Sequence, residues 1–247
     1  MGRRLGQHFL VRPSFLEKIA IAACPERAEL VLEIGPGKGA LTDHLLSRAD
    51  RIIAVEIDPV LVQYLRAKYR DQRRLEIVEA DVLKTDLTVW GRVAVAGNLP
   101  YYITTPIVEQ VLALKQNLVR AVFLVQKEVA ERIATGPGSR DYGYLSVATQ
   151  FYAVANLLFT IPPGAFRPPP KVDSAVIELC PRESLPDIDA QKFLKFVGRC
   201  FQYKRKTIRN NLLSFYDKDK LENLPEASQR AEQLGMAQFL ELYRKLA

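Results

Sequence analysis

Residues 30–40 read LVLEIGPGKGA, and this stretch decides the fold. Its first five residues are mostly large and apolar, which is typical of a strand buried on both faces of a parallel sheet. The glycines that follow let the backbone turn sharply and approach a ligand with no Cβ in the way. Because a helix is predicted over residues 40–48, this glycine loop lies between the end of a strand and the start of a helix. Doubly wound folds bind nucleosides at that position.

Strands of the same kind recur along the chain. Further buried strands are predicted at Arg51–Glu56, Leu75–Val78, Val93–Ala96 and Val119–Val125, and further helices at residues 59–69 and 105–115. Asp58 precedes Pro59, which gives the first of these two helices an N-cap followed by proline in its first turn. The alternation predicts βαβ units and therefore an α/β fold with a Rossmann-like parallel sheet.

The pattern changes after about residue 150. Asn156–Ile161 and Ser174–Cys180 read as two strands, joined by the proline-rich segment PPGAFRPPPKVD without a helix. We expect them to form an antiparallel pair at the edge of the sheet. From about residue 185 no strand is predicted, and FLKFVGRCF, TIRNNLLSFY and AEQLGMAQFLELYRKL read as helices. The expected domains are residues 1–184 and a small all-helical domain of residues 185–247.

The composition limits the class of protein. Hydrophobic residues make up 48% of the 247 residues, and no apolar run reaches the roughly 18 residues of a membrane span. The N-terminal residues lack a long apolar stretch, so we expect a cytoplasmic protein without a secretory signal. Three cysteines and two histidines, widely spaced, predict neither a disulfide framework nor a metal site. The net charge of +7 is compatible with a nucleic-acid partner, although many basic proteins bind none.

Acidic residues accompany three successive predicted strands. Glu33 lies near the end of the first strand, Glu56 ends the second and Asp81 follows the third. Because parallel strands end at one edge of a sheet, we expect the three carboxylates to lie near the glycine loop. A carboxylate at Glu56 can accept hydrogen bonds from both ribose hydroxyls, and one at Asp81 can accept from an adenine amino group. Asp81 taken alone would be an ordinary helix cap, but three acids in succession favour a binding site.

Two nucleoside cofactors are compatible with the glycine loop. Gly35, Gly37 and Ala40 satisfy the fingerprint G-x-G-x-x-G/A, so a nicotinamide enzyme is one interpretation. Pro36 removes a backbone N–H that a pyrophosphate would use, and Glu33 puts a carboxylate beside the loop. Both features favour S-adenosyl-L-methionine, whose ammonium and sulfonium groups are cationic.

A second motif, Asn98-Leu99-Pro100-Tyr101, follows the fourth predicted strand. Gly, Asn and Pro favour tight turns, so a purely structural turn is the alternative interpretation. The motif lies at the same sheet edge as the glycine loop, and this position favours a catalytic role over a purely structural turn. The Asn98 amide oxygen and the Leu99 carbonyl oxygen can accept the N6 hydrogens of an adenine, Pro100 can fix the turn, and Tyr101 can stack on the base. We expect no general base, because a methylated ammonium can lose its proton to water.

Nine motifs together carry a resemblance to a known family. They are GQHFL (6–10), EIGPGKGALT (33–42), AVEID (54–58), EADVL (79–83), NLPY (98–101), QKEV (126–129), YGYLS (142–146), FRPPPKVDS (166–174) and FQYKRKTIRN (201–210). In this order they resemble the KsgA/RsmA family of small-subunit ribosomal RNA adenine N6,N6-dimethyltransferases, from residue 6 to about residue 212.

The resemblance implies an enzyme that uses S-adenosyl-L-methionine to methylate two adjacent adenosines in a loop near the 3′ end of small-subunit (16S) rRNA. It also implies a monomer that acts on a pre-assembled small ribosomal subunit. The cofactor contacts implied by the resemblance and by the glycine loop are His8, Leu10, Glu33, Gly35, Gly37, Glu56, Asp81 and Asn98. The residues implied to handle the adenine are Asn98, Leu99, Pro100 and Tyr101, with Phe166 as a second aromatic wall. Tyr102 stands where relatives often carry Asn, so the pocket entrance is expected to differ.

The C-terminal region is rich in basic residues. Residues 185–247 hold twelve Lys and Arg against eight Asp and Glu, and the clearest cluster is Lys204, Arg205, Lys206 and Arg209. A solvated helix face is the alternative interpretation of such a cluster. The resemblance implies a basic helix that binds RNA phosphates, with the target base presented unpaired from a loop.

Three other functions stay open at this point. A large-subunit rRNA adenine methyltransferase would share the core of the fold. A non-catalytic RNA-binding assembly factor could keep the basic surface without transferring methyl groups. A nicotinamide oxidoreductase would use the same glycine loop.

Overall fold

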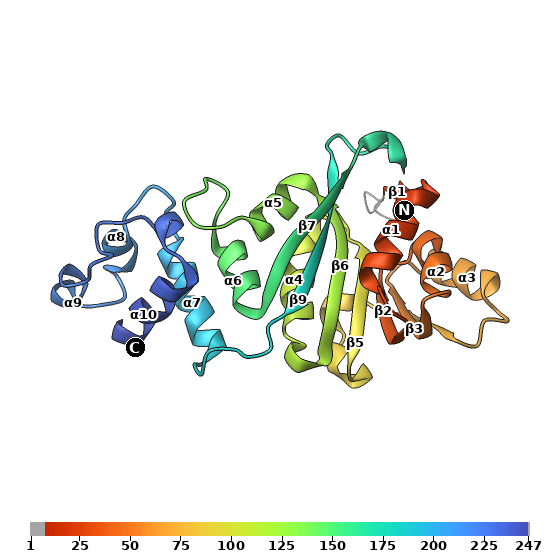
Figure 1. Ribbon diagram of the computed structural model, residues 1–247, viewed down its shortest axis with the longest axis horizontal. Coiled ribbons are helices and arrows are strands. Elements are labelled where there is room, and N and C mark those ends of the chain that lie inside the picture. The colour runs from red at the N-terminus through yellow and green to blue at the C-terminus, as the bar shows by residue number, and fades with distance from the viewer. Residues whose placement is uncertain (1–7, 247) are drawn as a thin grey trace. The chain divides into compact units, whose positions relative to one another are not determined.

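The computed structural model describes residues 8–246, which form two units (Figure 1). The sheet unit comprises Met1–Ala130 and Ala153–Glu183, and the helical unit comprises Glu131–Tyr152 and Ser184–Ala247. Gly6 and Gln7 of the first motif lie outside the described residues. Among the described residues, none of the helices combines the length and the apolar character needed to span a bilayer.

A seven-stranded sheet in the order β4-β3-β2-β5-β6-β9-β7 forms the centre of the sheet unit. Its strands are β2 (Ala28–Ile34), β3 (Ala49–Glu56), β4 (Leu75–Glu79), β5 (Val93–Asn98), β6 (Leu118–Gln126), β7 (Ala153–Ile161) and β9 (Ser174–Pro181). The five strands β2 to β6 pair in parallel, whereas β9 pairs antiparallel with both β6 and β7. The predicted Rossmann-like sheet with an antiparallel edge pair is therefore confirmed.

Helices cover the parallel strands. They are α1 (Pro13–Ala23), α2 (Ala40–Leu45), α3 (Pro59–Lys68) and α4 (Thr104–Leu112). In Figure 1 α1 and α2 lie close together, and α1 packs against β5 and β6. Alternate strand residues such as Val31, Ile52 and Val122 belong to the same buried cluster as Ile19 of α1. Helix α1 was not predicted, because it follows the GQHFL motif, in which no strand was predicted, and so it did not belong to the alternation of strands and helices.

The connection between β7 and β9 also contains more structure than expected. A single 3-10 turn (Pro163–Ala165) leads into the short strand β8 (Phe166–Arg167), which pairs antiparallel with β1 (Phe9–Leu10). This two-stranded pairing joins the N-terminal residues to a segment more than 150 residues away. Strands of only two residues each leave no pattern in the local sequence from which their pairing could be predicted.

The helical unit has its own aromatic core. Its helices are α6 (Tyr144–Tyr152), α7 (Ala190–Cys200), α8 (Ile208–Leu212), α9 (Lys218–Glu222) and α10 (Met236–Leu246), while α5 (Lys127–Ala134) runs across the boundary between the units. The expected division at residue 184 is wrong for residues 131–152. Tyr142 and Phe151 are buried with Phe193 and Phe239 of the helical unit, and this packing of non-local apolar side chains assigns the segment to that unit.

Candidate active site

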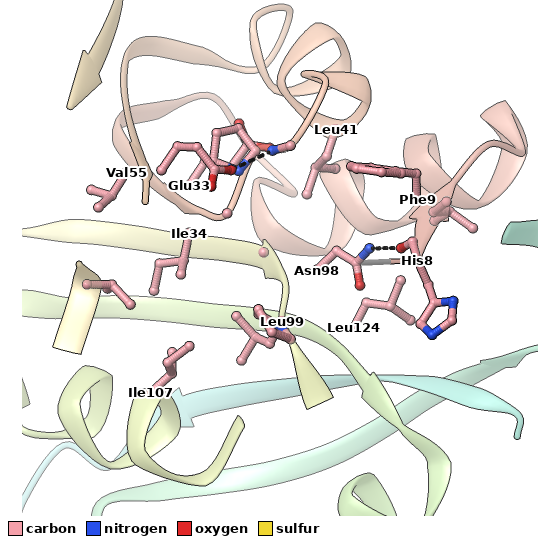
Figure 2. A pocket seen from close by; sticks show the side chains of 18 of the residues that line it. His8, Phe9, Glu33, Ile34, Leu41, Val55, Asn98, Leu99, Ile107 and Leu124 are labelled. Carbon is pink, nitrogen blue, oxygen red and sulfur yellow. Dashed lines mark hydrogen bonds between the residues drawn. The ribbon is translucent and has the colours of Figure 1, made fainter. Parts of the chain in front are cut away.

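A pocket opens at the carboxyl ends of β2, β3 and β5 (Figure 2). Among the residues that line it are all the predicted cofactor contacts and the four residues of the Asn98–Tyr101 motif. Three parallel strands, β2, β3 and β5, end at this edge of the sheet. Glu33, Glu56 and Asn98 therefore lie close together although they are far apart in sequence. The pocket brings together the residues that the sequence predicted to bind the cofactor.

The glycine loop forms one wall of this pocket. Gly35 and Gly37 have φ angles of +67° and +61°, which L side chains rarely adopt. A Cβ added at Gly37 would lie 2.9 Å from Cε1 of Phe9, and one added at Gly35 would lie 3.8 Å from the main-chain oxygen of Asn98. The loop therefore packs closely against both Phe9 and the Asn98–Tyr101 motif.

Glu56 ties the loop to the end of β3. Its carboxylate is 4% exposed and accepts hydrogen bonds from the backbone N–H groups of Gly37 (3.1 Å), Ile57 (3.0 Å) and Asp58 (3.0 Å). Burial raises its pKa, and these three hydrogen bonds oppose the rise. The side chain is held in one orientation. Oε1 accepts two of these bonds and Oε2 accepts one, so Oε2 keeps a lone pair for a hydroxyl donor.

Glu33 is the most deeply buried acid of the pocket. It is 1% exposed, and its carboxyl oxygen accepts a 2.7 Å hydrogen bond from Oγ1 of Thr42. Burial is the main cause that raises its pKa to about 8, and the Thr42 bond acts against it. A buried carboxyl of this kind favours a ligand that brings positive charge to it.

Asp81 occupies the third acidic position. Its Oδ1 accepts from the backbone N–H of Leu83 (3.0 Å), so it caps the 3-10 turn Val82–Lys84, and its Oδ2 lies 3.8 Å from Nζ of Lys84. It also lines the pocket. The helix-cap interpretation and the binding interpretation are therefore both compatible with its position, since the cap uses only part of the acceptor capacity of the carboxylate.

The Asn98–Tyr101 motif faces the acids across the pocket. Nδ2 of Asn98 donates to the main-chain oxygen of His8 (2.9 Å), and Figure 2 shows its amide oxygen directed away from His8. The backbone N–H of Leu99 donates to Leu124 (3.0 Å). Pro100 ends the turn with its carbonyl accepting from Ile103 (3.1 Å). These bonds hold the motif as a rigid turn whose side-chain acceptor is left for a ligand.

Tyr101 and His8 form the aromatic side of the site. The Tyr101 hydroxyl lies 2.7 Å from Oγ of Ser174, and the two rings of Tyr101 and His8 stack with centroids 5.8 Å apart. Nδ1 of His8 donates to the carbonyl oxygen of Pro168 (2.8 Å), because a carbonyl can only accept. Tyr102 lines the pocket too and is 66% exposed at its entrance.

Phe166 is not part of the pocket wall. Its side chain is 0% exposed in the core of the sheet unit, and its backbone pairs with Leu10 in the β1–β8 ladder. The expectation that it forms a second aromatic wall is therefore wrong in this structure. It packs in the same buried cluster as Leu10, its partner in the β1–β8 ladder.

The predicted basic cluster of the helical unit divides into two parts. Lys204, Arg205 and Lys206 lie in an exposed turn between α7 and α8, not on a helix. Nζ of Lys204 donates to the carbonyl oxygen of Arg140 (2.6 Å). Arg209 lies in α8 and forms a 2.6 Å ion pair with Glu222, and its role in RNA binding stays a prediction.

Sequence reasoning did not single out Phe9 and Lys38, which line the pocket, or Ser174, which contacts Tyr101. Phe9 lines the pocket, and Nζ of Lys38 lies 5.6 Å from the centre of its ring. Ser174 reaches the site only through Tyr101. Phe9 and Ser174 lie inside the quoted motifs GQHFL and FRPPPKVDS, and that membership was the available signal.

The donors and acceptors of the pocket fit S-adenosyl-L-methionine better than a dinucleotide. Glu33, Glu56 and Asp81 offer acceptors to cationic, hydroxyl and amino groups. Pro36 lines the loop without an N–H, so the loop offers one backbone donor fewer to a pyrophosphate. The chemistry of the acceptors therefore argues against the nicotinamide interpretation.

The chain matches a known protein family over nearly its whole length. The family profile described as ribosomal RNA adenine dimethylase matches residues 2–247. The chain is 41% identical to ribosomal RNA small subunit methyltransferase A of Acidobacterium capsulatum, covering 98% of this chain and 90% of that protein. It is 40% identical to the protein of the same name from Pseudomonas putida, covering 99% and 94%.

Solved structures of similar proteins have the same fold. A dimethyladenosine transferase from Plasmodium falciparum superposes with a TM-score of 0.83 at 27% identity, covering 96% of this chain and 98% of that one. The 23S rRNA methyltransferase ErmE superposes with a TM-score of 0.73 at 28% identity, covering 96% and 99%. The matched profile and the two curated relatives span nearly the whole chain, and five of the nine motifs contribute residues to the pocket. The chain belongs to the ribosomal RNA adenine dimethylase family, whose members use S-adenosyl-L-methionine.

Proposed function

We propose that this protein transfers methyl groups from S-adenosyl-L-methionine to the N6 amines of two adjacent adenosines in a loop near the 3′ end of small-subunit (16S) rRNA. The products are N6,N6-dimethyladenosines. One observation carries the proposal: Asn98 is oriented by its bond to His8 so that its amide oxygen is available in the pocket that holds Glu33, Glu56 and Asp81. The names of the curated relatives support the small subunit as the substrate.

The acidic side of the pocket binds the cofactor. Glu56 would accept a hydrogen bond from a ribose hydroxyl, Asp81 would accept from the adenine amino group, and Glu33 would hold the cationic methionine portion. Bound S-adenosyl-L-methionine supplies a methyl group activated by the neighbouring sulfonium. Gly35 and Gly37 allow the main chain of the loop to approach without a Cβ.

The opposite side of the pocket activates the substrate amine. An adenine N6 is a poor nucleophile because its lone pair is delocalised into the ring. The Asn98 amide oxygen and the Leu99 carbonyl oxygen accept the two N6 hydrogens, which raises the electron density on nitrogen and favours a tetrahedral arrangement. A hydrogen bond that strengthens in the transition state lowers the barrier by about 1–3 kcal/mol.

Tyr101 holds the base in the reacting position. Stacking on an aromatic ring is worth on the order of 1–3 kcal/mol per base, and the Tyr101 ring is fixed on two sides by Ser174 and His8. Holding amine and methyl donor in line contributes further acceleration. The proton leaves the methylated nitrogen to water, so the pocket needs no histidine or aspartate base.

The RNA partner is engaged outside the pocket. The exposed turn at Lys204, Arg205 and Lys206 offers charge to phosphates, and the target adenosines must be unpaired to enter the site. We place the reaction on a pre-assembled small ribosomal subunit in the cytoplasm, with the protein acting as a monomer.

The test is to incubate the protein with radiolabelled S-adenosyl-L-methionine and three substrates: unmodified small subunits, naked small-subunit rRNA, and large subunits. We expect label on two adjacent adenosines of the small subunit, mapped by primer extension and by mass spectrometry of the nucleosides. Label on large-subunit rRNA alone would identify the activity expected from the ErmE likeness instead. Binding to small subunits without any label would identify a non-catalytic assembly factor.

A further inference from the structure

The hydroxyl group of Tyr101 is anchored in the sheet. It lies 2.7 Å from Oγ of Ser174, a residue with 0% exposure, and either oxygen can be the donor. Ser174 is the first residue of β9 and pairs with Gln126 of β6 and Ile161 of β7. The anchor is therefore held by two neighbouring strands.

The ring of Tyr101 is held as well. His8 stacks against it at an interplanar angle of 25°, and His8 is itself fixed by the bond from its Nδ1 to Pro168. Burial raises the pKa of Tyr101, and the bond to Ser174 works in the opposite direction. The phenol stays protonated at neutral pH, so its contact with Ser174 is a bond between two neutral hydroxyls.

The geometry points to Ser174 as a positioning residue that fixes the position of the Tyr101 ring for the incoming adenine, while the stacked His8 restricts the plane of that ring. This inference rests on the proposed function and adds a residue to it. Ser174 itself does not line the pocket, so it acts through Tyr101 and not on the substrate. Without the anchor the Tyr101 hydroxyl loses its partner, and the ring is free to swing toward water, where it can satisfy that hydroxyl. A mobile ring must be ordered when the adenine binds, and this entropic cost reduces the affinity that stacking provides.

A double-mutant cycle tests the bond directly. The variants are Ser174→Ala, Tyr101→Phe and the combination, and kcat/KM is measured for the unmodified small subunit at saturating cofactor. Tyr101→Phe keeps the ring and removes only the hydroxyl. Each single change should lower kcat/KM about 3- to 10-fold, the range expected for one hydrogen bond. The kcat/KM of the double variant should be no lower than that of the less active single variant, because both changes delete the same bond.

Further variants separate the hydrogen bond from packing. Ser174→Cys nearly preserves the volume but offers a poor hydrogen-bond partner, whereas Ser174→Thr keeps the hydroxyl. We expect Cys to behave like Ala and Thr to stay close to the parent. Ser146→Ala is the matched control, since Ser146 is a buried serine of the helical unit that donates to the carbonyl of Arg132. It should lower the thermal midpoint without any coupling to Tyr101→Phe.

The outcomes distinguish this inference from the proposed function. Additive losses in the cycle, or unchanged kcat/KM in Ser174→Ala, would overturn the positioning role while leaving the methyl transfer intact. Failure of the parent to methylate rRNA would reject the proposed function instead. In that case NMR of ¹³C-labelled tyrosine rings, with Tyr101 assigned by its Phe variant, still tests the anchor. A Tyr101 signal that is unchanged by Ser174→Ala would reject it.

Discussion

Nδ2 of Asn98 donates to the main-chain oxygen of His8 over 2.9 Å, across 90 residues of sequence. This bond decides which end of the amide faces the pocket. Because the nitrogen is used by the protein, the oxygen is the atom left for an adenine amine (Figure 2). The orientation follows from an acceptor that belongs to the backbone, so it does not depend on the identity of the side chain at position 8.

Asn98→Ala should therefore reduce methyl transfer by about 100-fold while RNA binding persists, since it deletes an acceptor used in the transition state. Asn98→Asp should be impaired as well, because a carboxylate cannot donate to the oxygen of His8. Single-turnover methylation and a filter-binding assay measure the two quantities. Asn156→Ala, an exposed asparagine paired with Glu178 in the same unit, is the control. Transfer rates equal to the parent's would refute the role of Asn98.

Gly37→Ala should weaken cofactor binding about tenfold or more. The new Cβ would lie 2.9 Å from the Phe9 ring at a φ of +61°, so either Phe9 or the loop must move, and the bond from Gly37 to Glu56 moves with it. Isothermal titration calorimetry with S-adenosyl-L-methionine gives the affinity. Gly138→Ala has a φ of +86° with nothing within 4 Å of the added Cβ, so it carries the backbone strain without the clash. If both variants bind the cofactor as the parent does, the close packing of the loop is unimportant for binding.

Glu33→Gln should change how stability depends on pH. The folded chain keeps the Glu33 proton up to a pKa of about 8, whereas the unfolded chain releases it near 4.5, so the folded state binds the extra proton between these values. The free energy of unfolding therefore falls as pH rises through this window, by at most about 1.4 kcal/mol per pH unit. The stabilisation that comes from the raised Glu33 pKa is complete below pH 4.5 and is lost above about pH 8. Glutamine can still accept from Thr42 but does not titrate.

Urea unfolding between pH 5 and pH 8.5 measures this effect. The parent should lose stability with rising pH more steeply than Glu33→Gln. Glu109→Gln, which changes an exposed carboxyl of α4, should follow the parent curve. Parallel curves for the parent and Glu33→Gln would contradict the burial argument. The groups that act on Glu33 besides burial are Thr42, Asp43, Glu56 and Lys68.

Arg205→Ala combined with Lys206→Ala should weaken RNA binding and reduce the slope of log K against log salt by about one for each lost phosphate contact. Both side chains are exposed in the turn after α7. Lys218→Ala combined with Lys220→Ala removes the same charge from α9 and should leave the slope nearly unchanged. Equal slopes for the parent and the first double variant would show that this turn does not contact RNA.

Arg209→Ala should act on stability more than on RNA binding. Its guanidinium is paired with Glu222 and its side chain is only 35% exposed. We expect a lower thermal midpoint in a melting experiment, with a salt dependence close to that of the parent. A salt slope reduced as strongly as in the variant with both Arg205→Ala and Lys206→Ala would show instead that Arg209 contacts RNA phosphates.

Local sequence determined the sheet and the place of the site. The apolar runs, the glycine loop and Asp58-Pro59 are short-range signals, and each is read correctly because its physical cause lies within a few residues. Parallel strands end at one edge, so the acids at Glu33 and Glu56 and the motif at Asn98 were predicted to meet, and they line one pocket. The family followed from nine motifs in order.

Only the tertiary structure decided which atoms these residues present. The bond from Asn98 to His8 spans 90 residues, that from Tyr101 to Ser174 spans 73, and neither is marked by any periodicity. The burial of Phe166 and the packing of Phe151 with the helical unit depend on partners far away in sequence. Hydrophobic burial and side-chain hydrogen bonding are satisfied by whichever neighbours the fold supplies, so a linear pattern can identify a residue's chemistry but not its partner.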